Sequence, residues 1–438
     1  MFEGFSTATR ALRYRNFRLF FAGQSISLIG TWMQRIALGW LVYRLTNSAF
    51  LLGIVGFAGQ LPTFIFTPFA GVLADRLNRH RLIILTQSIA MLQALLLAAL
   101  VFSGVIVIWH VITLSILLGI INAMDMPVRQ SFTVEMVEGR ENLGNAIALN
   151  SSMVNAARLV GPSLAGVIIA ATGEGFCFLI NGLSYIAVIA ALLMMKLPRQ
   201  RVGSGNKKNP LQQLKEGYVY AYSFAPIRAI LLLLSIVSLV GMPYTVLMPV
   251  FAKTILQGDA STLGILMGAA GLGALAGAGY LASRRTVLGL GSWMAFTTVV
   301  FALGLIAFSF SRYFYLSLLF MLFTGFGMIS LMAASNTILQ TIVDDDKRGR
   351  VMSFYTVSIM GMLPFGSLLT GALAGKFGAP ATFAVGGLIC LLSAGFFYYR
   401  LPALRVLVRP IYARMGIIPE IAAGLQSASE ISTHDKNT

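Results

Sequence analysis

Charged residues are scarce in this sequence. Of its 438 residues only 11% are charged and just 15 are acidic, whereas 57% are hydrophobic; soluble domains average about 25% charged residues. The mean hydropathy is +0.81. A water-soluble domain has too little interior to bury this much apolar surface. The composition therefore excludes an ordinary soluble protein and indicates an integral membrane protein.

Cysteine and nucleotide-binding motifs are also nearly absent. The two cysteines, Cys177 and Cys390, lie far apart in apolar stretches without metal-ligand spacing, so we expect neither a disulfide framework nor a metal site. No GxxxxGK[ST] loop is present to bind ATP phosphates, and no Ser/His/Asp spacing indicates a hydrolase. We therefore predict no enzyme and no bound cofactor, with an ion gradient as the energy source.

Apolar stretches of about 20 residues recur along nearly the whole chain, and each is long enough to cross a bilayer as a helix. The pattern predicts an all-α membrane protein of twelve transmembrane helices in two pseudo-symmetric six-helix bundles. The predicted helices are 17–44, 50–74, 81–103, 105–129, 142–171 and 175–196, followed by 226–252, 261–283, 287–310, 312–341, 349–375 and 379–400.

Basic residues fix the predicted orientation. With the N-terminus in the cytoplasm, 26 of the 32 Lys and Arg fall in cytoplasmic segments, and only Arg44, Lys253, Arg312 and Lys376 face outward. This is the positive-inside bias of a bacterial inner-membrane protein, so the net charge of +17 does not indicate a nucleic-acid partner. The predicted segments are a cytoplasmic N-tail (1–16), an N-terminal bundle (17–196), a cytoplasmic linker (197–225), a C-terminal bundle (226–400) and a cytoplasmic C-tail (401–438).

The two halves resemble each other at a nearly fixed offset. Residues 27–30 match 238–241 at an offset of 211, and residues 71–74 match 279–282 at an offset of 208. Gly161 and Gly166 match Gly366 and Gly371 at an offset of 205. Together these matches indicate a duplicated six-helix unit. That architecture places a binding site at mid-membrane between halves that rock around it.

The loop after the second predicted helix carries the most specific motif. Residues 71–81 read GVLADRLNRHR, which resembles the signature loop G-x-L-a-D-r-x-G-r-k of the major facilitator superfamily. Asn78 replaces a glycine there, a mild departure because Asn tolerates a left-handed turn. The resemblance implies that this loop latches the halves in the outward-open state, with Asp75, Arg79 and Asp125 as a charge relay. The predicted switch residues are Gly71, Asp75, Arg76, Arg79, Asp125, Arg129, Gly161, Pro162 and Gly166.

Two parts of this switch have alternative interpretations. Asp125 lies one turn from Arg129, and because membrane charges tend to pair, an ion pair is favoured over a proton carrier. Residues 157–166 resemble the G-x-x-x-G-P-x-x-G-G pattern of drug/proton antiporters, with Ala157 and Ala165 in place of two glycines. Gly161 and Pro162 alternatively only shape a packed helix.

Two predicted helices carry a cation within a polar face. Gln24, Ser27, Thr31 and Arg35 share one face of the first helix, and Ser151, Asn155, Arg158 and Pro162 share one face of the fifth. Since a polar face avoids lipid, we expect both cations to reach a common aqueous cavity and to favour an anionic substrate. Alternatively, Arg35 snorkels to the outer interface and Arg158 bonds helix carbonyls. Asn336 is a weaker polar candidate for substrate contact.

The resemblance to the superfamily covers almost all of residues 10–400. Residues 13–20 and 30–40 look like its exporter branch, which includes macrolide and siderophore (enterobactin-type) efflux proteins. The resemblance implies a monomeric secondary transporter that exports a bulky, amphipathic or anionic small molecule by alternating access, and proton antiport follows from the resemblance only. A lysophospholipid or nutrient transporter and a non-transporting membrane sensor remain alternatives.

Overall fold

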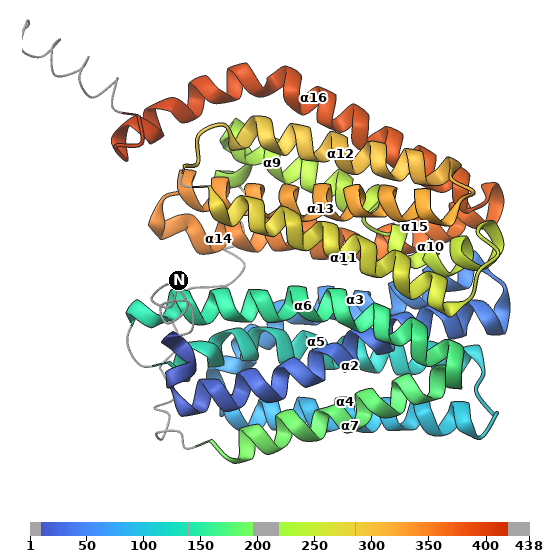
Figure 1. The fold of residues 1–438 in the computed structure, drawn as a ribbon. Helices are drawn as coiled ribbons and strands as arrows, with labels where there is room; N and C mark the ends of the chain where they lie inside the picture. Colours follow the sequence, from blue (N-terminus) through green and yellow to red (C-terminus); the bar gives the residue numbers. More distant parts are fainter. Residues whose placement is uncertain (1–9, 138–139, 196–218, 285, 419–438) are drawn as a thin grey trace, which may run out of the picture.

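The computed structural model describes residues 10–137, 140–195, 219–284 and 286–418, and no strand occurs among them. Two helical bundles lie side by side with their helices running in roughly the same direction (Figure 1). A short 3-10 turn, η1 (Arg10–Arg13), precedes the first bundle. That N-terminal bundle consists of α2 (Arg15–Thr46), α3 (Ala49–Arg76), α4 (Arg79–Phe102), α5 (Ile108–Glu135), α6 (Arg140–Thr172) and α7 (Glu174–Leu193).

The C-terminal bundle also has six spans, two of which are interrupted. Its first span joins four segments, and its fifth joins three. In order the elements are α9 (Ala225–Ile236), η2 (Val237–Gly241), α10 (Tyr244–Val250) and η3 (Phe251–Ile255), then α11 (Ala260–Ser283), α12 (Leu290–Phe310), α13 (Phe314–Ile342), α14 (Asp345–Thr356), η4 (Val357–Gly361), α15 (Met362–Phe377) and α16 (Ala379–Arg414). The predicted all-α fold of two six-helix bundles is confirmed.

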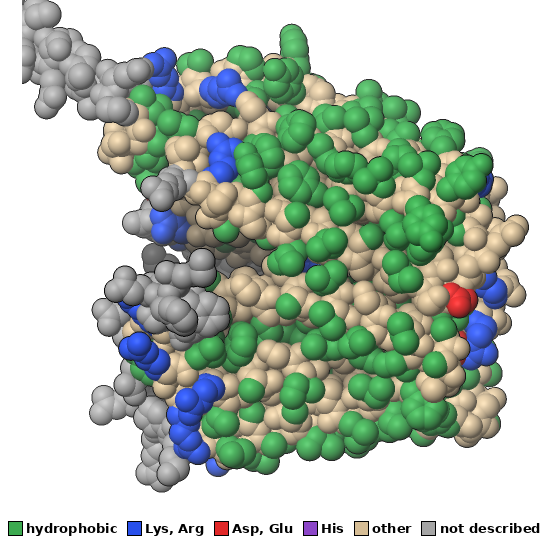
Figure 2. Space-filling model, in the orientation of Figure 1, with side chains coloured by type: hydrophobic (Ala, Val, Ile, Leu, Met, Phe, Trp, Pro, Cys, Tyr) green, Lys and Arg blue, Asp and Glu red, His purple; other side chains and the backbone are tan. Residues whose placement is uncertain are grey.

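Eleven segments of the described chain are long and apolar enough to cross a membrane. The remaining long helix, α2, is not among them because its polar face lowers its hydropathy, yet it has 32 residues and packs against α6 and α7. Large exposed apolar side chains such as Leu92, Val167 and Phe396 cover the lateral surface (Figure 2). Such a surface is stable in contact with lipid, so the chain is a multi-pass membrane protein.

Two features of the helices differ from the sequence prediction. The last helix continues to Arg414 instead of ending near 400, through Pro402 and Pro410. Proline removes one helical hydrogen bond, a loss that neighbouring groups or water compensate. The π-helical segments η2 and η4 were also not predicted. They contain Leu239 and Met360, whose carbonyls lie four residues before Pro243 and Pro364, so the α-helical hydrogen bond from residue i+4 is not available to them.

Helix packing repeats between the bundles at the offsets found in the sequence. A Cβ atom on Gly161 would meet Trp32, and one on Gly366 would meet Pro243, which lies 211 residues after Trp32. Likewise Gly30 lies against Asn181. The equivalent pair is Gly241, 211 residues after Gly30, which lies against Cys390, 209 residues after Asn181. The duplicated six-helix unit is therefore visible in individual contacts.

The two ends of the molecule differ in charge. The end with η1 and the turns at 76–79, 283–290 and 342–345 carries most of the visible Lys and Arg (Figure 2), and we call it the basic end. The turns at 46–49, 172–174, 255–260 and 377–379 lie at the opposite end.

Two symmetry-related helix crossings join the bundles near the opposite end. In one, α3 meets α15, where a Cβ atom on Gly53 would lie 2.8 Å from the Cα of Gly371. In the other, α6 meets α11, where a Cβ atom on Gly166 would lie 2.9 Å from the Cα of Gly264. Glycine is required at such backbone contacts. Toward the basic end the space-filling view is hollowed between the bundles (Figure 2), so the described residues of the two bundles meet near the opposite end and leave a hollow at the basic end.

Candidate substrate-binding site

The indole of Trp32 lies beside both cations that the sequence predicted at mid-membrane. The guanidinium carbon of Arg35 lies 4.7 Å from the centroid of the ring, and that of Arg158 lies 5.2 Å from it. Both are cation–π distances. The structure therefore brings Arg35 of α2 and Arg158 of α6 together around one aromatic ring.

Close helix packing fixes the position of Trp32. A Cβ atom on Gly161 would lie only 2.5 Å from the Cβ of Trp32 and 3.1 Å from the carbonyl oxygen of Ile29. Any side chain at position 161 would push α6 away from α2 at the level of the cations. Gly161 thus has a local packing role, whereas Gly166 joins the two bundles. Pro162 is one residue closer to the crossing, and its carbonyl faces Gly264.

The two cations differ in their surroundings. Arg35 is exposed although it lies deep along α2, whereas Nε and Nη1 of Arg158 are buried without a hydrogen-bond partner among the described residues. Arg158 also lies at the boundary between the bundles. A Cβ atom on Gly271 of α11 would meet its backbone oxygen at 3.2 Å, and the buried phenol of Tyr244 is close enough to interact with its charge.

The other predicted contact residues lie in several environments. Gln24 and Ser27 are buried inside the N-terminal bundle, and Oε1 of Gln24 has no partner among the described residues. Thr31 donates to the carbonyl oxygen of Ser27 at 2.9 Å. Ser151 is exposed and Asn155 is half-buried. Asn336 lies on α13 and accepts a hydrogen bond of 2.6 Å from Gln340. Of the four predicted contact residues of α2, Arg35 is thus the exposed one.

A chain of buried amides holds the helices around the site, and sequence reasoning missed it. Asn181 donates to Gln34 at 2.7 Å, Gln34 donates to Gln93 at 3.1 Å, and Gln93 donates to the carbonyl oxygen of Leu114 at 3.2 Å. The chain links α7, α2, α4 and α5. A signal was present, because Gln34 lies next to Arg35, but amides scattered over three helices share no sequence spacing.

Asp125 lies inside a second polar cluster of the N-terminal bundle. Its carboxylate pairs with Arg129 at 3.0 Å and accepts hydrogen bonds from Thr86 at 3.0 Å and Gln87 at 2.8 Å. The carboxylate is buried and its charge is compensated, which is the arrangement that low-dielectric surroundings favour. This ion pair near the basic end agrees with a structural or switching role.

The signature loop is described only in part. The side chains of Gly71, Asp75 and Arg76 lie outside the described residues, and Arg79 opens α4. Asn78, at the position where the family has glycine, has a φ of −70° and does not use a left-handed conformation. Asn78 instead caps α4, since its side chain accepts from the amide of Arg81 at 3.1 Å. Capping satisfies one of the free amides at a helix start.

A separate cavity of about 540 Å³ lies at the basic end of the C-terminal bundle. It is lined by residues of α13, α16 and the segment before α9, including Tyr220, Asp344 and Arg414. None of the predicted contact residues lines it. It is therefore distinct from the site around Trp32.

Two six-helix bundles with this site between them have the fold of a membrane transporter. The chain belongs to the transmembrane secretion effector family of the major facilitator superfamily, whose profile matches residues 6–409. The predicted resemblance to the exporter branch of that superfamily is confirmed.

Relatives and solved structures agree with this membership. The staphyloferrin A transporter of Staphylococcus aureus (strain NCTC 8325 / PS 47) is 27% identical over 385 residues, 87% of this chain and 95% of that protein. The multidrug efflux pump Tap of Mycolicibacterium fortuitum is 28% identical over 396 residues, 86% and 93% of the two chains. The enterobactin exporter EntS of Salmonella paratyphi A (strain ATCC 9150 / SARB42) is 25% identical over 377 residues, 85% and 88%.

The fold is shared with more distant transporters. A bacterial homologue of the human lysosomal transporter Spinster, in an inward-facing and unoccupied conformation, superposes with a TM-score of 0.68 at 14% identity. The match covers 91% of this chain and 98% of that one.

Proposed function

We propose that this chain is a secondary active transporter that exports a bulky, amphipathic or anionic small molecule by alternating access. The observation that carries the proposal is the asymmetry of the two ends. Paired glycine crossings close one end, while the space between the bundles stays open at the end rich in Lys and Arg. Alternating access requires this state and a second state in which the opposite end is open and the basic end is closed.

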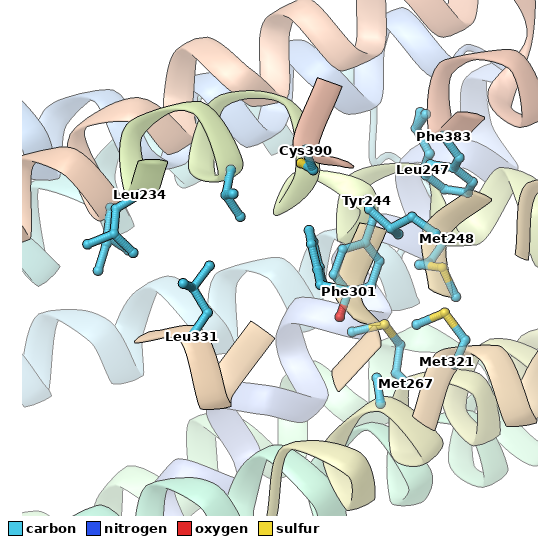
Figure 3. Packing of buried hydrophobic residues seen from close by; sticks show 14 of the residues in the cluster. Leu234, Tyr244, Leu247, Met248, Met267, Phe301, Met321, Leu331, Phe383 and Cys390 are labelled. Atoms are coloured by element: carbon cyan, nitrogen blue, oxygen red, sulfur yellow. The ribbon is translucent and has the colours of Figure 1, made fainter. Parts of the chain in front are cut away.

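The composition of the two bundles supports an amphipathic substrate. The N-terminal bundle supplies Arg35 and Arg158, while the facing part of the C-terminal bundle is apolar. Figure 3 shows Tyr244, Met248, Met267, Phe301 and Met321 packed together in the buried core of that bundle, and Tyr244 lies near Arg158. Methionine adapts to irregular shapes. Relatives named as an enterobactin exporter and a multidrug efflux pump favour transport in the outward direction and a bulky substrate.

The proposed setting is the inner membrane of a bacterium, with both chain ends in the cytoplasm. The positive-inside rule supports this orientation, because the basic end then faces the cytoplasm. In this orientation the described conformation is open toward the cytoplasm and ready to load a substrate for export. We further propose that the protein works as a monomer, because both crossings lie within one chain.

Energy coupling is proposed to be proton antiport. The support is the likeness to exporters, and the N-terminal bundle also buries one carboxylate, Asp125, which is paired with Arg129. If protons drive export, an ionophore that collapses the proton gradient stops accumulation in inverted vesicles. If accumulation persists without a proton gradient, antiport with protons is wrong.

Counterflow in proteoliposomes tests the function itself. Vesicles preloaded with unlabelled compounds, siderophores and macrolides among them, are expected to accumulate the matching labelled compound without any gradient. Binding of a compound without exchange would instead favour a membrane sensor of transporter fold. The double variant Arg35→Gln/Arg158→Gln serves as a folded, binding-impaired comparison, and Arg312→Gln, which removes an exposed arginine far from the site, is the matched control.

A further inference from the structure

We propose that Trp32, Arg35 and Arg158 form a binding site for an organic dianion whose two negative charges sit on a planar, aromatic frame. The proposal rests on the proposed transport function and names the substrate class for it.

The first step is the charge balance of the site. Neither Arg35 nor Arg158 forms an ion pair with a carboxylate among the described residues. The nearest buried acid, Asp125, is already paired with Arg129 and bonded to Thr86 and Gln87. Two positive charges therefore remain uncompensated by the described residues. Arg35 is exposed, but Nε and Nη1 of Arg158 are buried, and an uncompensated charge away from water is costly until a counter-ion arrives.

The second step is the number of open hydrogen-bond donors. Nε and Nη1 of Arg158 are buried without a partner, and no hydrogen bond of the Arg35 side chain occurs among the described residues. A guanidinium presents a planar fork that matches a carboxylate with two parallel bonds. Two such forks fit two carboxylates, or a comparable pair of anionic oxygens, on one molecule.

The third step is the geometry of the frame. The two guanidinium carbons lie 4.7 and 5.2 Å from the centroid of one indole, so they are at most about 10 Å apart. Two anionic groups on one aromatic frame fall within that span. An aromatic frame also stacks on guanidinium planes and on the indole.

The fourth step is the location. Arg158 borders Gly271 of α11 and Tyr244 of α10, both in the C-terminal bundle. A ligand held by the two arginines therefore touches both bundles. Its binding is coupled to their relative position, which is the requirement for a transported substrate.

The test uses purified full-length protein and three matched probes. Phthalate carries two carboxylates on one ring, benzoate carries one, and dimethyl phthalate carries none. Calorimetric titration is expected to give affinity in that order, with each charge contributing about tenfold, as expected for a charge-assisted hydrogen bond. The Trp32 fluorescence should be quenched by phthalate. Trp32→Phe should lose that part of the signal while retaining calorimetric binding.

Variants separate binding from folding. Arg35→Gln and Arg158→Gln should each lower phthalate affinity about tenfold, to the level of benzoate, while leaving dimethyl phthalate unchanged. Arg158→Lys keeps the charge and should retain most of the preference for phthalate. The control Arg312→Gln should behave as the unmodified protein.

Three results overturn the proposal: no saturable phthalate binding, equal affinity for phthalate and its diester, or a charge preference that survives Arg35→Gln/Arg158→Gln. Counterflow distinguishes this failure from failure of the transport function. Exchange of other compounds without a dianion preference rejects only the site. Charge-selective binding without exchange of any compound rejects transport and keeps the site.

Discussion

The two bundles share one topology but bury different polar groups. Within the described residues, the N-terminal bundle buries the carboxylates Asp125 and Glu174 and the amides Gln24, Gln34, Gln87, Gln93 and Asn181. The buried polar side chains of the C-terminal bundle are all serines and threonines. Many of these hydroxyls donate to the carbonyl four residues earlier in their own helix, as Thr298 does at 2.7 Å and Ser335 at 2.7 Å.

The difference has a mechanical consequence. Amides that bond across helices fix the helices relative to one another, whereas hydroxyls satisfied within their own helix leave neighbouring helices joined by apolar packing. The stacked rings of Phe251 and Phe308, 4.1 Å apart, and three π-helical segments belong to the C-terminal bundle. We infer that the N-terminal bundle is the rigid frame that holds the cations, and that the C-terminal bundle is the adaptable wall.

The largest expected effect comes from joining the two bundles covalently. A Cβ atom on Gly56 would lie 3.0 Å from the Cβ of Ser367, near the separation that a disulfide spans. With Cys177 and Cys390 replaced, Gly56→Cys/Ser367→Cys should cross-link on oxidation and lower counterflow more than about tenfold, with recovery on reduction. Gly59→Cys/Ser115→Cys is the control. Its Cβ atoms would lie 3.7 Å apart within one bundle, so transport should persist. Full transport by the cross-linked first pair would contradict rocking of the bundles.

A second, smaller effect concerns the ion pair of the N-terminal bundle. Asp125→Asn leaves the cation of Arg129 without its buried partner, so the free energy of unfolding should fall by about 3 kcal/mol. Thermal unfolding in detergent measures this change. The double variant Asp125→Asn/Arg129→Gln should recover part of the loss, because no unpaired charge remains. If the double variant loses more free energy of unfolding than Asp125→Asn and Arg129→Gln lose together, the pair is not the source of the stability.

The comparison of amides and hydroxyls predicts a third effect. Asn181→Leu removes a donor and leaves Oε1 of Gln34 buried and unsatisfied, which should cost about 2 kcal/mol. Ser335→Ala in the C-terminal bundle removes a hydroxyl bonded within its own helix and should cost less than about 1 kcal/mol. Thermal unfolding of both variants measures the two losses of stability. Equal losses would remove the basis for calling one bundle the frame.

The smallest effect is at the start of α11, outside the membrane-spanning part of the helix. Asp259 accepts from Ser261 and Thr262, and the hydrogen bond with the Ser261 side chain lowers the pKa of the Asp259 carboxyl. Its stabilisation is therefore present above the unfolded pKa and is lost as the pH falls through the folded pKa. Asp259→Ala should cost about 1 kcal/mol. Asp259→Asn should keep the cap and lose its pH dependence, as measured by unfolding at several pH values.

The sequence predicted much of the fold because apolar length is a strong signal. The start of α6 at Arg140 and the end of α11 at Ser283 lie within two residues of the predicted bounds. The continuation of α16 to Arg414 was missed, because Pro402 normally favours a helix end and only the tertiary context overrides that preference. Gly166 and Gly371, which the internal offset matches with each other, both lie at the crossings between the bundles.

The site was predicted in part. Helical spacing placed Arg35 and Arg158 on polar faces, but it contained no information on their common neighbour. Trp32 is the residue between them because Gly161 lets α6 approach α2 at that level, which is a contact between residues 129 positions apart. The burial of Gln24 and Ser27 was not predictable either. Helical spacing places residues on one face, but it does not tell which of them lie against the neighbouring helix α7.

Two interbundle distances test the central account most directly. Spin labels at Ser103→Cys and Arg312→Cys report on the opposite end, and labels at Arg81→Cys and Ala282→Cys report on the basic end, all in lipid nanodiscs. Alternating access predicts a second population in which the first distance lengthens while the second shortens, and substrate shifts the two populations. Two distances that stay fixed, or that lengthen together, would contradict it.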